Sequence, residues 1–293
     1  MEQMSKSVKK NKLLCAAKII AAVSIIILFL QDFMLFHPGH DEQSWTYLTA
    51  RAEFQAVEFL SSGNTRYGLL RHGAQQQGPL IIFFYGNAMN AAGTMRAMER
   101  FGIWPYFLDF NVLVVDYAGY GPGRMGVRRR MQPAGMRPSA RNMYADALAA
   151  FDFARALPGV SQIIVGAYSI GTAPAVYLAA HRETAGLFLL SPFANVYDLF
   201  NNVLPIFHGP LRLLVRHKFY SDRHAQAVTV PALLVASHSD EVIPFASSQR
   251  LNDRFGGQTT FVELSGVRHG EILFHRTSLE SVQAYLLGLI KSE

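Results

Sequence analysis

The chain of 293 residues contains a single cysteine, Cys15, and only 16% of its residues are charged. One cysteine excludes a disulfide framework and any zinc site built from several thiolates. The ten histidines lie without the spacing of metal ligands, so we expect no catalytic metal and no cofactor. Half of the residues are hydrophobic, and this share excludes a disordered or fibrous protein.

The net charge of +6 is concentrated at the start of the chain. Residues 1–18 hold five lysines and one glutamate, whereas the rest of the chain holds 22 basic and 20 acidic residues. A nearly neutral body argues against nucleic acid as a partner.

An apolar stretch over residues 13–36, with a few polar interruptions, follows the basic start. It reaches the ~20 residues of a membrane-spanning helix if Lys18 extends its amine to the nearer interface. Residues 31–45 offer no small-residue cleavage site. The sequence therefore predicts a cytoplasmic tail and an uncleaved signal anchor over 1–36, with a catalytic domain over 37–293. A cleaved signal peptide and a buried core helix are the alternatives.

The flanking charges predict how the anchor is oriented. No Lys or Arg occurs between Lys18 and Arg51, whereas lysines crowd the N-terminal side. The positive-inside bias places the N-terminus in the cytoplasm and the catalytic domain on the non-cytoplasmic side of the membrane. That side is the periplasm in a bacterium and the lumen or the exterior in a eukaryote.

From about residue 50 onward, short apolar runs alternate with helical patterns at 139–157, 172–180 and 278–290. Runs such as LIIFFY and VLVV are continuously apolar, which is typical of strands buried on both faces. The alternation predicts an α/β fold with a mostly parallel, doubly wound sheet and an antiparallel start. The predicted strands are Phe54–Leu60, Arg66–Arg71, Leu80–Tyr85, Val112–Asp116, Gln162–Tyr168, Gly186–Leu190, Ala232–Ala236 and Thr259–Leu264.

The stretch 162–180, QIIVGAYSIGTAPAVYLAA, places a serine between a buried strand and a small-residue helix. Ala167-Tyr168-Ser169-Ile170-Gly171 approximates G-x-S-x-G, the sharp turn that exposes a nucleophilic serine oxygen. Small residues are needed two positions before and after the serine because strand and helix pack closely there. The sequence therefore predicts Ser169 as a nucleophile.

A serine nucleophile needs a base, and the base needs an orienting acid, in the chain order Ser, Asp or Glu, His. Asp240 follows the strand-like PALLVAS, with Glu241 as its nearest rival, and His269 follows the strand-like TTFVEL. Both candidates lie past the carboxyl end of a predicted strand, where sites gather in open α/β sheets.

An oxyanion hole needs two N–H groups directed at the developing negative charge. The residue after the nucleophile, Ile170, would supply one backbone N–H. The loop after Leu80–Tyr85 would supply the other, with Gly86 allowing close approach and Asn87 as the donor.

Taken together, these segments resemble the α/β-hydrolase superfamily. The likeness covers about residues 30–290. It rests on Tyr85-Gly86-Asn87-Ala88, the DYAGYG stretch 116–121, the elbow at Ser169, Asp240 with Ile243-Pro244, and His269-Gly270. Within the superfamily the chain is most similar to the small, capless, membrane-anchored branch of bud-emergence hydrolases and alpha/beta-hydrolase-domain acyl-protein thioesterases. Phe36-His37-Pro38 is similar to the Phe-x-Pro stretch of that branch.

The resemblance implies Ser169 as nucleophile, Asp240 as acid and His269 as base of a serine hydrolase. It would cleave a small-molecule acyl ester or thioester, lipid-derived substrates included, through an acyl-enzyme. Three positions depart from the family pattern: Tyr85 replaces His, Ala167 replaces Gly and Ala118 replaces Arg. A catalytically silent binding module, and an acyltransferase or peptidase with the same triad, are the alternatives. The sequence does not fix the oligomeric state.

Two further stretches bear on the substrate. Residues 191–230 are predicted to form an acyl-chain groove or membrane-facing surface, or else two ordinary amphipathic helices. Residues 117–145 hold six arginines and no acidic residue, and their Gly and Pro content predicts a loop. This loop either binds phosphate or lipid headgroups or is an ordinary solvated loop.

Overall fold

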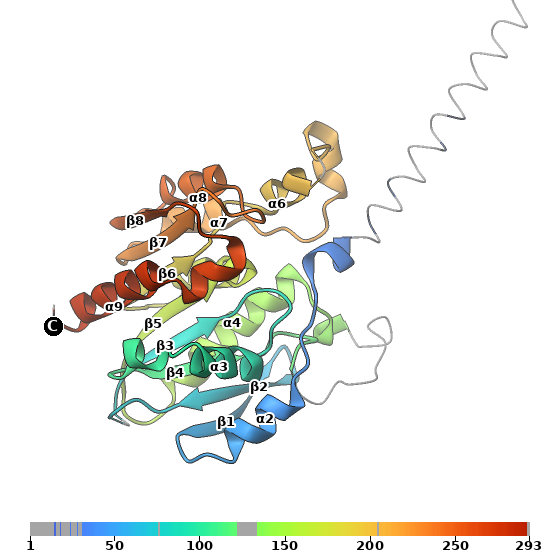
Figure 1. Cartoon of the computed structure of the whole chain (residues 1–293). Helices are drawn as coiled ribbons and strands as arrows, with labels where there is room; N and C mark the ends of the chain where they lie inside the picture. The colour runs from blue at the N-terminus through green and yellow to red at the C-terminus, as the bar shows by residue number, and fades with distance from the viewer. Residues whose placement is uncertain are drawn as a thin grey trace, which may run out of the picture.

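The computed structural model describes residues 31–75, 77–121, 134–203 and 205–291, together with the isolated positions Cys15, Lys18, Ser24 and Leu28. The described residues form an eight-stranded sheet with helices on both faces (Figure 1). All eight predicted strands are present, with ends that differ by at most two residues. The strands are β1 (Phe54–Ser61), β2 (Asn64–Arg71), β3 (Gly78–Phe84), β4 (Asn111–Val115), β5 (Val160–Tyr168), β6 (Gly186–Leu190), β7 (Ala232–Ser237) and β8 (Thr259–Leu264).

The strand order is β1-β2-β4-β3-β5-β6-β7-β8. β1 and β2 form an antiparallel hairpin and β2 pairs antiparallel with β4, whereas the remaining neighbours are parallel. Ser62 and Gly63 form the hairpin turn at φ 50° and 72°. Two positive φ values identify the turn type whose twist matches the flanking strands. The antiparallel start and the parallel body of the predicted sheet are both confirmed.

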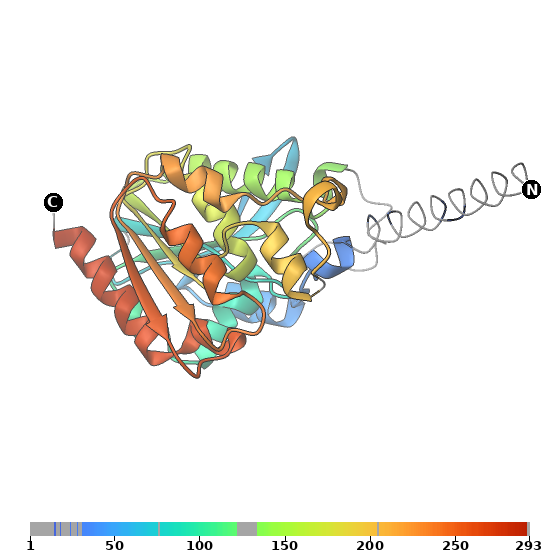
Figure 2. The same cartoon turned by 90° about the horizontal axis from the view of Figure 1, so that it is seen from above.

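Helices cover the two faces of the sheet (Figures 1 and 2). α3 and α9 lie on one face, and α4 and α5 pack on each other over the other face. The helices are α2 (Glu42–Thr49), α3 (Ala91–Arg100), α4 (Ala140–Arg155), α5 (Thr172–Ala179), α6 (Val196–Val203), α7 (Ser221–His224), α8 (Phe245–Asn252) and α9 (Arg276–Lys291). Short 3-10 turns are η1 (Trp104–Phe107), η3 (Ala134–Met136), η4 (Ser169–Gly171), η5 (Gly209–Leu214), η6 (Ala225–Ala227) and η7 (His269–Phe274).

Helix α4 shows how local sequence and packing agree. The Ser139 side chain accepts a hydrogen bond from the Asn142 N–H (3.1 Å) and so satisfies one unpaired donor of the first turn. Met143, Ala147 and Phe151, spaced one turn apart, are buried against the sheet. Deep burial of an apolar side chain stabilises by about 1.5–3 kcal/mol, so this stripe fixes which face of the helix points inward.

The last residues of the predicted anchor pack on the domain. Residues 31–35 are helical, and Leu35 and Phe36 belong to the same hydrophobic core as the strands. Most of the predicted anchor, 13–36, lies outside the described residues. Within the part of the chain that the structure describes, no helix is long and apolar enough to cross a membrane.

Candidate active site

Ser169 sits at a strained turn between β5 and α5. Its φ is +55°, a left-handed conformation that L-residues rarely adopt outside functional turns. Gly171 lets the turn approach β3, because a Cβ there would lie 2.3 Å from the Phe84 carbonyl oxygen. Ala167 is fully buried within β5, so the strand accommodates its methyl group in place of the family glycine.

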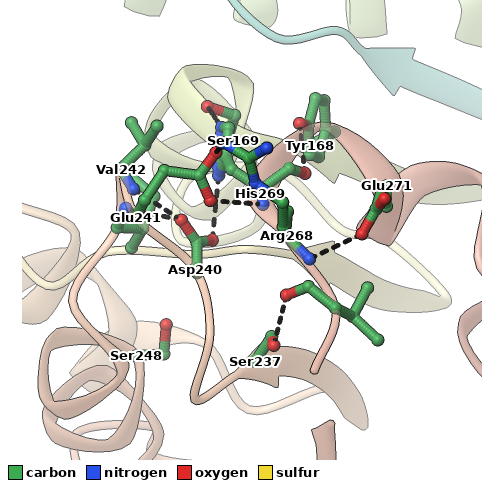
Figure 3. Close-up of polar contacts among 12 residues, drawn as sticks. Tyr168, Ser169, Ser237, Asp240, Glu241, Val242, Ser248, Arg268, His269 and Glu271 are labelled. Atoms are coloured by element: carbon green, nitrogen blue, oxygen red, sulfur yellow. Dashed lines mark hydrogen bonds and ion pairs between the residues drawn. The ribbon is translucent and has the colours of Figure 1, made fainter. Parts of the chain in front are cut away.

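Three side chains from separate loops form one hydrogen-bonded relay (Figure 3). Ser169 Oγ lies 2.9 Å from His269 Nε2, and His269 Nδ1 lies 2.8 Å from Asp240 Oδ2. An ionised carboxylate only accepts hydrogen bonds, so Nδ1 carries the ring hydrogen and Nε2 is left to accept from the serine hydroxyl. This is the tautomer a base needs to take the proton from Ser169.

The relay is sheltered from water. The side chains of Asp240 and His269 are 2% and 13% exposed, and Ser169 is buried. The second carboxylate oxygen, Asp240 Oδ1, accepts from the backbone N–H groups of Val242 (2.9 Å) and Ile243 (2.8 Å). With both oxygens bonded, the buried carboxylate is satisfied and fixed in orientation.

Glu241, the nearest rival to Asp240 as the acid, has a different place. Its carboxylate accepts the His269 backbone N–H (3.0 Å) and pairs with the Arg268 guanidinium (3.1 Å) (Figure 3). The backbone hydrogen bond from His269, helped by Arg268, lowers the pKa of Glu241. Glu241 therefore holds the histidine backbone, whereas Asp240 contacts the imidazole.

Tyr168 supports the histidine from the other side. Its hydroxyl donates to the His269 carbonyl oxygen (2.8 Å), and the two rings stack with centroids 5.2 Å apart. The sequence alone does not predict this role, although Tyr168 occupies the variable position just before the nucleophile. No local pattern reports a contact that spans 101 residues of chain.

A cavity of about 370 Å³ opens above the relay. Ser169 and His269 form its floor, together with the predicted oxyanion residues Asn87 and Ile170. Its walls are mostly apolar: Met34, Leu35, Leu199, Phe200, Val203, Val242 and Ile243. The stretch 191–230 thus forms α6, which lines the cavity, then η5 and α7.

The loop that holds Asn87 is tied to the N-terminal segment. Asn87 Oδ1 accepts from the His37 backbone N–H (2.8 Å) and the Tyr120 hydroxyl (3.1 Å), and Asn87 Nδ2 lies 2.9 Å from His37 Nδ1. The Gly39 N–H donates to the Met89 carbonyl oxygen (3.2 Å). These bonds fix the loop whose backbone faces Ser169.

Tyr85 stands where the resembling family has His, and it points away from the cavity. Its hydroxyl donates to Asp116 Oδ1 (2.9 Å), which also accepts the Ala91 N–H (2.7 Å). Burial raises the pKa of Asp116 to about 6 and the pKa of Tyr85 well above its ordinary value. The pair supports the loop that holds Asn87, and neither residue lines the cavity.

The described residues include only part of the arginine-rich stretch. Arg124 and the arginines at 128–130 lie outside the described residues. Arg141 lines a second, wider cavity between α4 and residues 216–218.

The chain is similar to known proteins over most of its length. No protein-family profile matches the chain. The uncharacterised protein Rv2307c of Mycobacterium tuberculosis is 31% identical over 221 residues, covering 73% of this chain and 72% of that protein. Human alpha/beta hydrolase domain-containing protein 17C is 27% identical over 252 residues, covering 84% of this chain and 70% of that protein.

Solved structures with the same fold include esterases. Est1E from Butyrivibrio proteoclasticus superposes with a TM-score of 0.61 at 18% identity, covering 80% of this chain and 99% of that chain. The Pyrococcus furiosus esterase Pf2001 gives 0.65 at 14% identity, covering 88% and 97%. The chain belongs to the α/β-hydrolase superfamily.

Proposed function

We propose that the protein is a serine hydrolase that cleaves an acyl ester or thioester through an acyl-enzyme. The observation that carries the proposal is the Ser169–His269–Asp240 relay, with hydrogen bonds of 2.9 and 2.8 Å, on a strained turn at the floor of a mostly apolar cavity. A buried serine, a base of defined tautomer and a fixed carboxylate are the parts that acyl transfer needs.

The reaction runs in two halves. Ser169 Oγ attacks the acyl carbon while His269 Nε2 takes the hydroxyl proton, and the tetrahedral oxyanion faces the Ile170 and Asn87 backbone N–H groups. The C–O or C–S bond then breaks, and His269 gives its proton to the departing alcohol or thiol. Water, deprotonated by His269, attacks the acyl-enzyme, and the collapse releases a carboxylic acid and restores Ser169.

Labelling with a fluorophosphonate probe tests the nucleophile. We expect the wild type to be labelled and Ser169→Ala to be unlabelled, with turnover lowered by several orders of magnitude. Ser191→Ala is the matched control, because Ser191 is also buried at positive φ (49°) but its Oγ has no hydrogen-bond partner among the described residues. Labelling that survives Ser169→Ala would refute the assignment.

The alternatives predict different results. A silent binding module would give neither labelling nor turnover in a folded sample. Tyr85 and Ala167, two of the departures from the family pattern, do not line the cavity. An acyltransferase would give transfer products when an alcohol or amine competes with water. A peptidase would cleave amides in preference to esters.

The apolar cavity walls favour a lipophilic acyl group, because each buried methylene contributes about 0.8 kcal/mol. We expect kcat/KM to rise along a series of esters from two to sixteen carbons. A flat or falling profile would favour small soluble esters.

Location belongs to the same proposal: the apolar stretch 13–36 anchors the protein, with the catalytic domain on the non-cytoplasmic side. A compartment-sensitive reporter fused to the C-terminus tests the orientation, and reporter activity typical of the cytoplasm would contradict it.

A further inference from the structure

Exposed apolar side chains concentrate on the segments that line the catalytic cavity or bond to its wall. Six of the ten large apolar side chains that are exposed among the described residues lie on three such segments, which are far apart in sequence. We call them the mouth rim: Phe33, Met34, Val203, Leu211, Leu213 and Val242. Met34, Val203 and Val242 also line the cavity itself. Clustered apolar exposure of this kind marks an interaction surface.

The first of these segments is bound firmly to the others. The Gln31 side chain donates to the Leu214 carbonyl oxygen (2.7 Å) and accepts from the Arg216 N–H (2.7 Å). Asp32 pairs with Arg216 and lies 2.7 Å from His217 Nε2. Figures 1 and 2 show residues 31–35, in blue, beside α6 and η5 at one end of the molecule.

This attachment sets where the preceding residues enter. Residues 13–30 are apolar apart from Lys18 and Ser24, and they join directly to Gln31. The apolar stretch is therefore attached to the domain at the end that carries the mouth rim.

Positive charge flanks the rim. The second cavity, of about 930 Å³, is lined by Arg141, Arg216, His217 and Lys218 and by no acidic side chain. Asp32 pairs with Arg216, but Arg141 and Lys218 have no acidic partner among the ion pairs of the described residues. Apolar side chains bordered by cations are complementary to an anionic lipid surface.

We propose that the mouth rim docks on a lipid bilayer, so that the catalytic cavity opens toward the membrane and receives its acyl substrate from the lipid phase. The occupant is a bilayer with anionic headgroups, because an apolar chain segment and flanking cations converge on the same end of the molecule. The substrate half of this proposal rests on the proposed hydrolase function, whereas the docking half does not.

Depth-dependent fluorescence quenching tests docking on the full chain. Cys15→Ser removes the native thiol, and Leu213→Cys or Leu60→Cys introduces one label; the two leucines are 83% and 71% exposed, but Leu60 lies on β1, away from the rim. In vesicles of phosphatidylcholine and phosphatidylglycerol, brominated lipid should quench the label at 213 and not at 60. Equal quenching at both positions would overturn the proposal. So would a label at 213 that is shielded from aqueous iodide but not quenched by lipid, because a protein partner would then cover the rim.

Kinetics test substrate entry. Leu213→Asp should lower kcat/KM roughly tenfold for a long-chain ester embedded in vesicles, since tenfold corresponds to about 1.4 kcal/mol, slightly less than the full burial of one leucine contributes. Turnover of soluble p-nitrophenyl acetate should not change, and Leu60→Asp should change neither. An equal loss on both substrates, or no loss on vesicles, would refute entry from the lipid phase. If the wild type turned over neither ester, the hydrolase proposal would fail while the quenching result still decided docking.

Discussion

The strained backbone at Ser169 gives a measurable stability difference that is separate from catalysis. Ser169 has φ +55°, and the left-handed region costs a residue with a Cβ about 1–2 kcal/mol. Glycine does not incur that cost. Comparing Ser169→Gly with Ser169→Ala isolates the backbone, because both variants lack Oγ and its hydrogen bond to His269.

A second buried serine serves as a reference for the other contributions that an alanine-to-glycine change makes to the free energy of unfolding. Ser237 is a buried serine in β7, where the backbone is extended. Replacing alanine by glycine there should destabilise by about 1–2 kcal/mol, from chain entropy and one lost buried methyl group. The same terms apply at position 169, but relief of the strained φ offsets them. The alanine-to-glycine change should therefore be about 1–2 kcal/mol less destabilising at 169 than at 237.

Urea unfolding of the four full-length variants in one detergent gives the free energies of unfolding. Both Ser169 variants should also be inactive and unlabelled by fluorophosphonate. Alanine-to-glycine differences at the two positions that agree within about 0.5 kcal/mol would show that the turn stores no backbone strain, and the argument from φ would fail.

Three further perturbations are expected to have distinct signatures. Burial raises the pKa of Asp116 to about 6, so the folded state holds this proton more tightly than the unfolded state and stability should fall as pH rises from about 4 to 6. The difference in unfolding free energy between the wild type and Asp116→Asn should change by roughly 1–3 kcal/mol across that window. A difference that does not change with pH would contradict this expectation. Gly171→Ala places a methyl group 2.3 Å from a backbone oxygen of β3 and should destabilise the protein by about 1–3 kcal/mol in urea unfolding. Gly288→Ala, in open space on α9, is the control and should stabilise the protein by about 0.5–1 kcal/mol. Equal effects of the two substitutions would refute the clash at position 171. His37→Ala removes the acceptor of the Asn87 side-chain amide and should lower kcat about three- to tenfold at constant KM. His37→Asn should restore kcat, because its side-chain oxygen can accept the same hydrogen bond. A change confined to KM would show that this bond does not position the loop.

The sheet could be predicted from the sequence because its strands are locally distinctive. β3 and β4 read as continuous apolar runs, and burial on both faces is what such runs require. α4 combined a serine cap with an apolar stripe, so it was found as well. α3 was missed, although Asn90 caps it by accepting the Gly93 N–H (2.6 Å), because few of its residues are strongly apolar: its buried face consists of Ala91, Ala92, Thr94, Met95 and Met98.

The relay could be anticipated because its members follow strand ends in a fixed order. Parallel strands bring their carboxyl ends to one edge, so Ser169 after β5, Asp240 after β7 and His269 after β8 converge although 100 residues separate the first from the last. The choice of Asp240 over Glu241 depended on side-chain direction, which spacing leaves open. Only the three-dimensional arrangement shows which carboxylate reaches the imidazole.

The walls of the cavity depend on contacts that no local pattern records. Gln31 bonds to Leu214 across 183 residues, and His37 bonds to Asn87 across 50. The segment 31–39 thus connects the cavity wall to the loop that faces the nucleophile. Because one segment makes both sets of contacts, a displacement of residues 31–36 would open the wall and loosen the Asn87 loop together. The N-terminal segment is consequently part of the cavity wall, and its Leu35 and Phe36 belong to the same hydrophobic core as the strands.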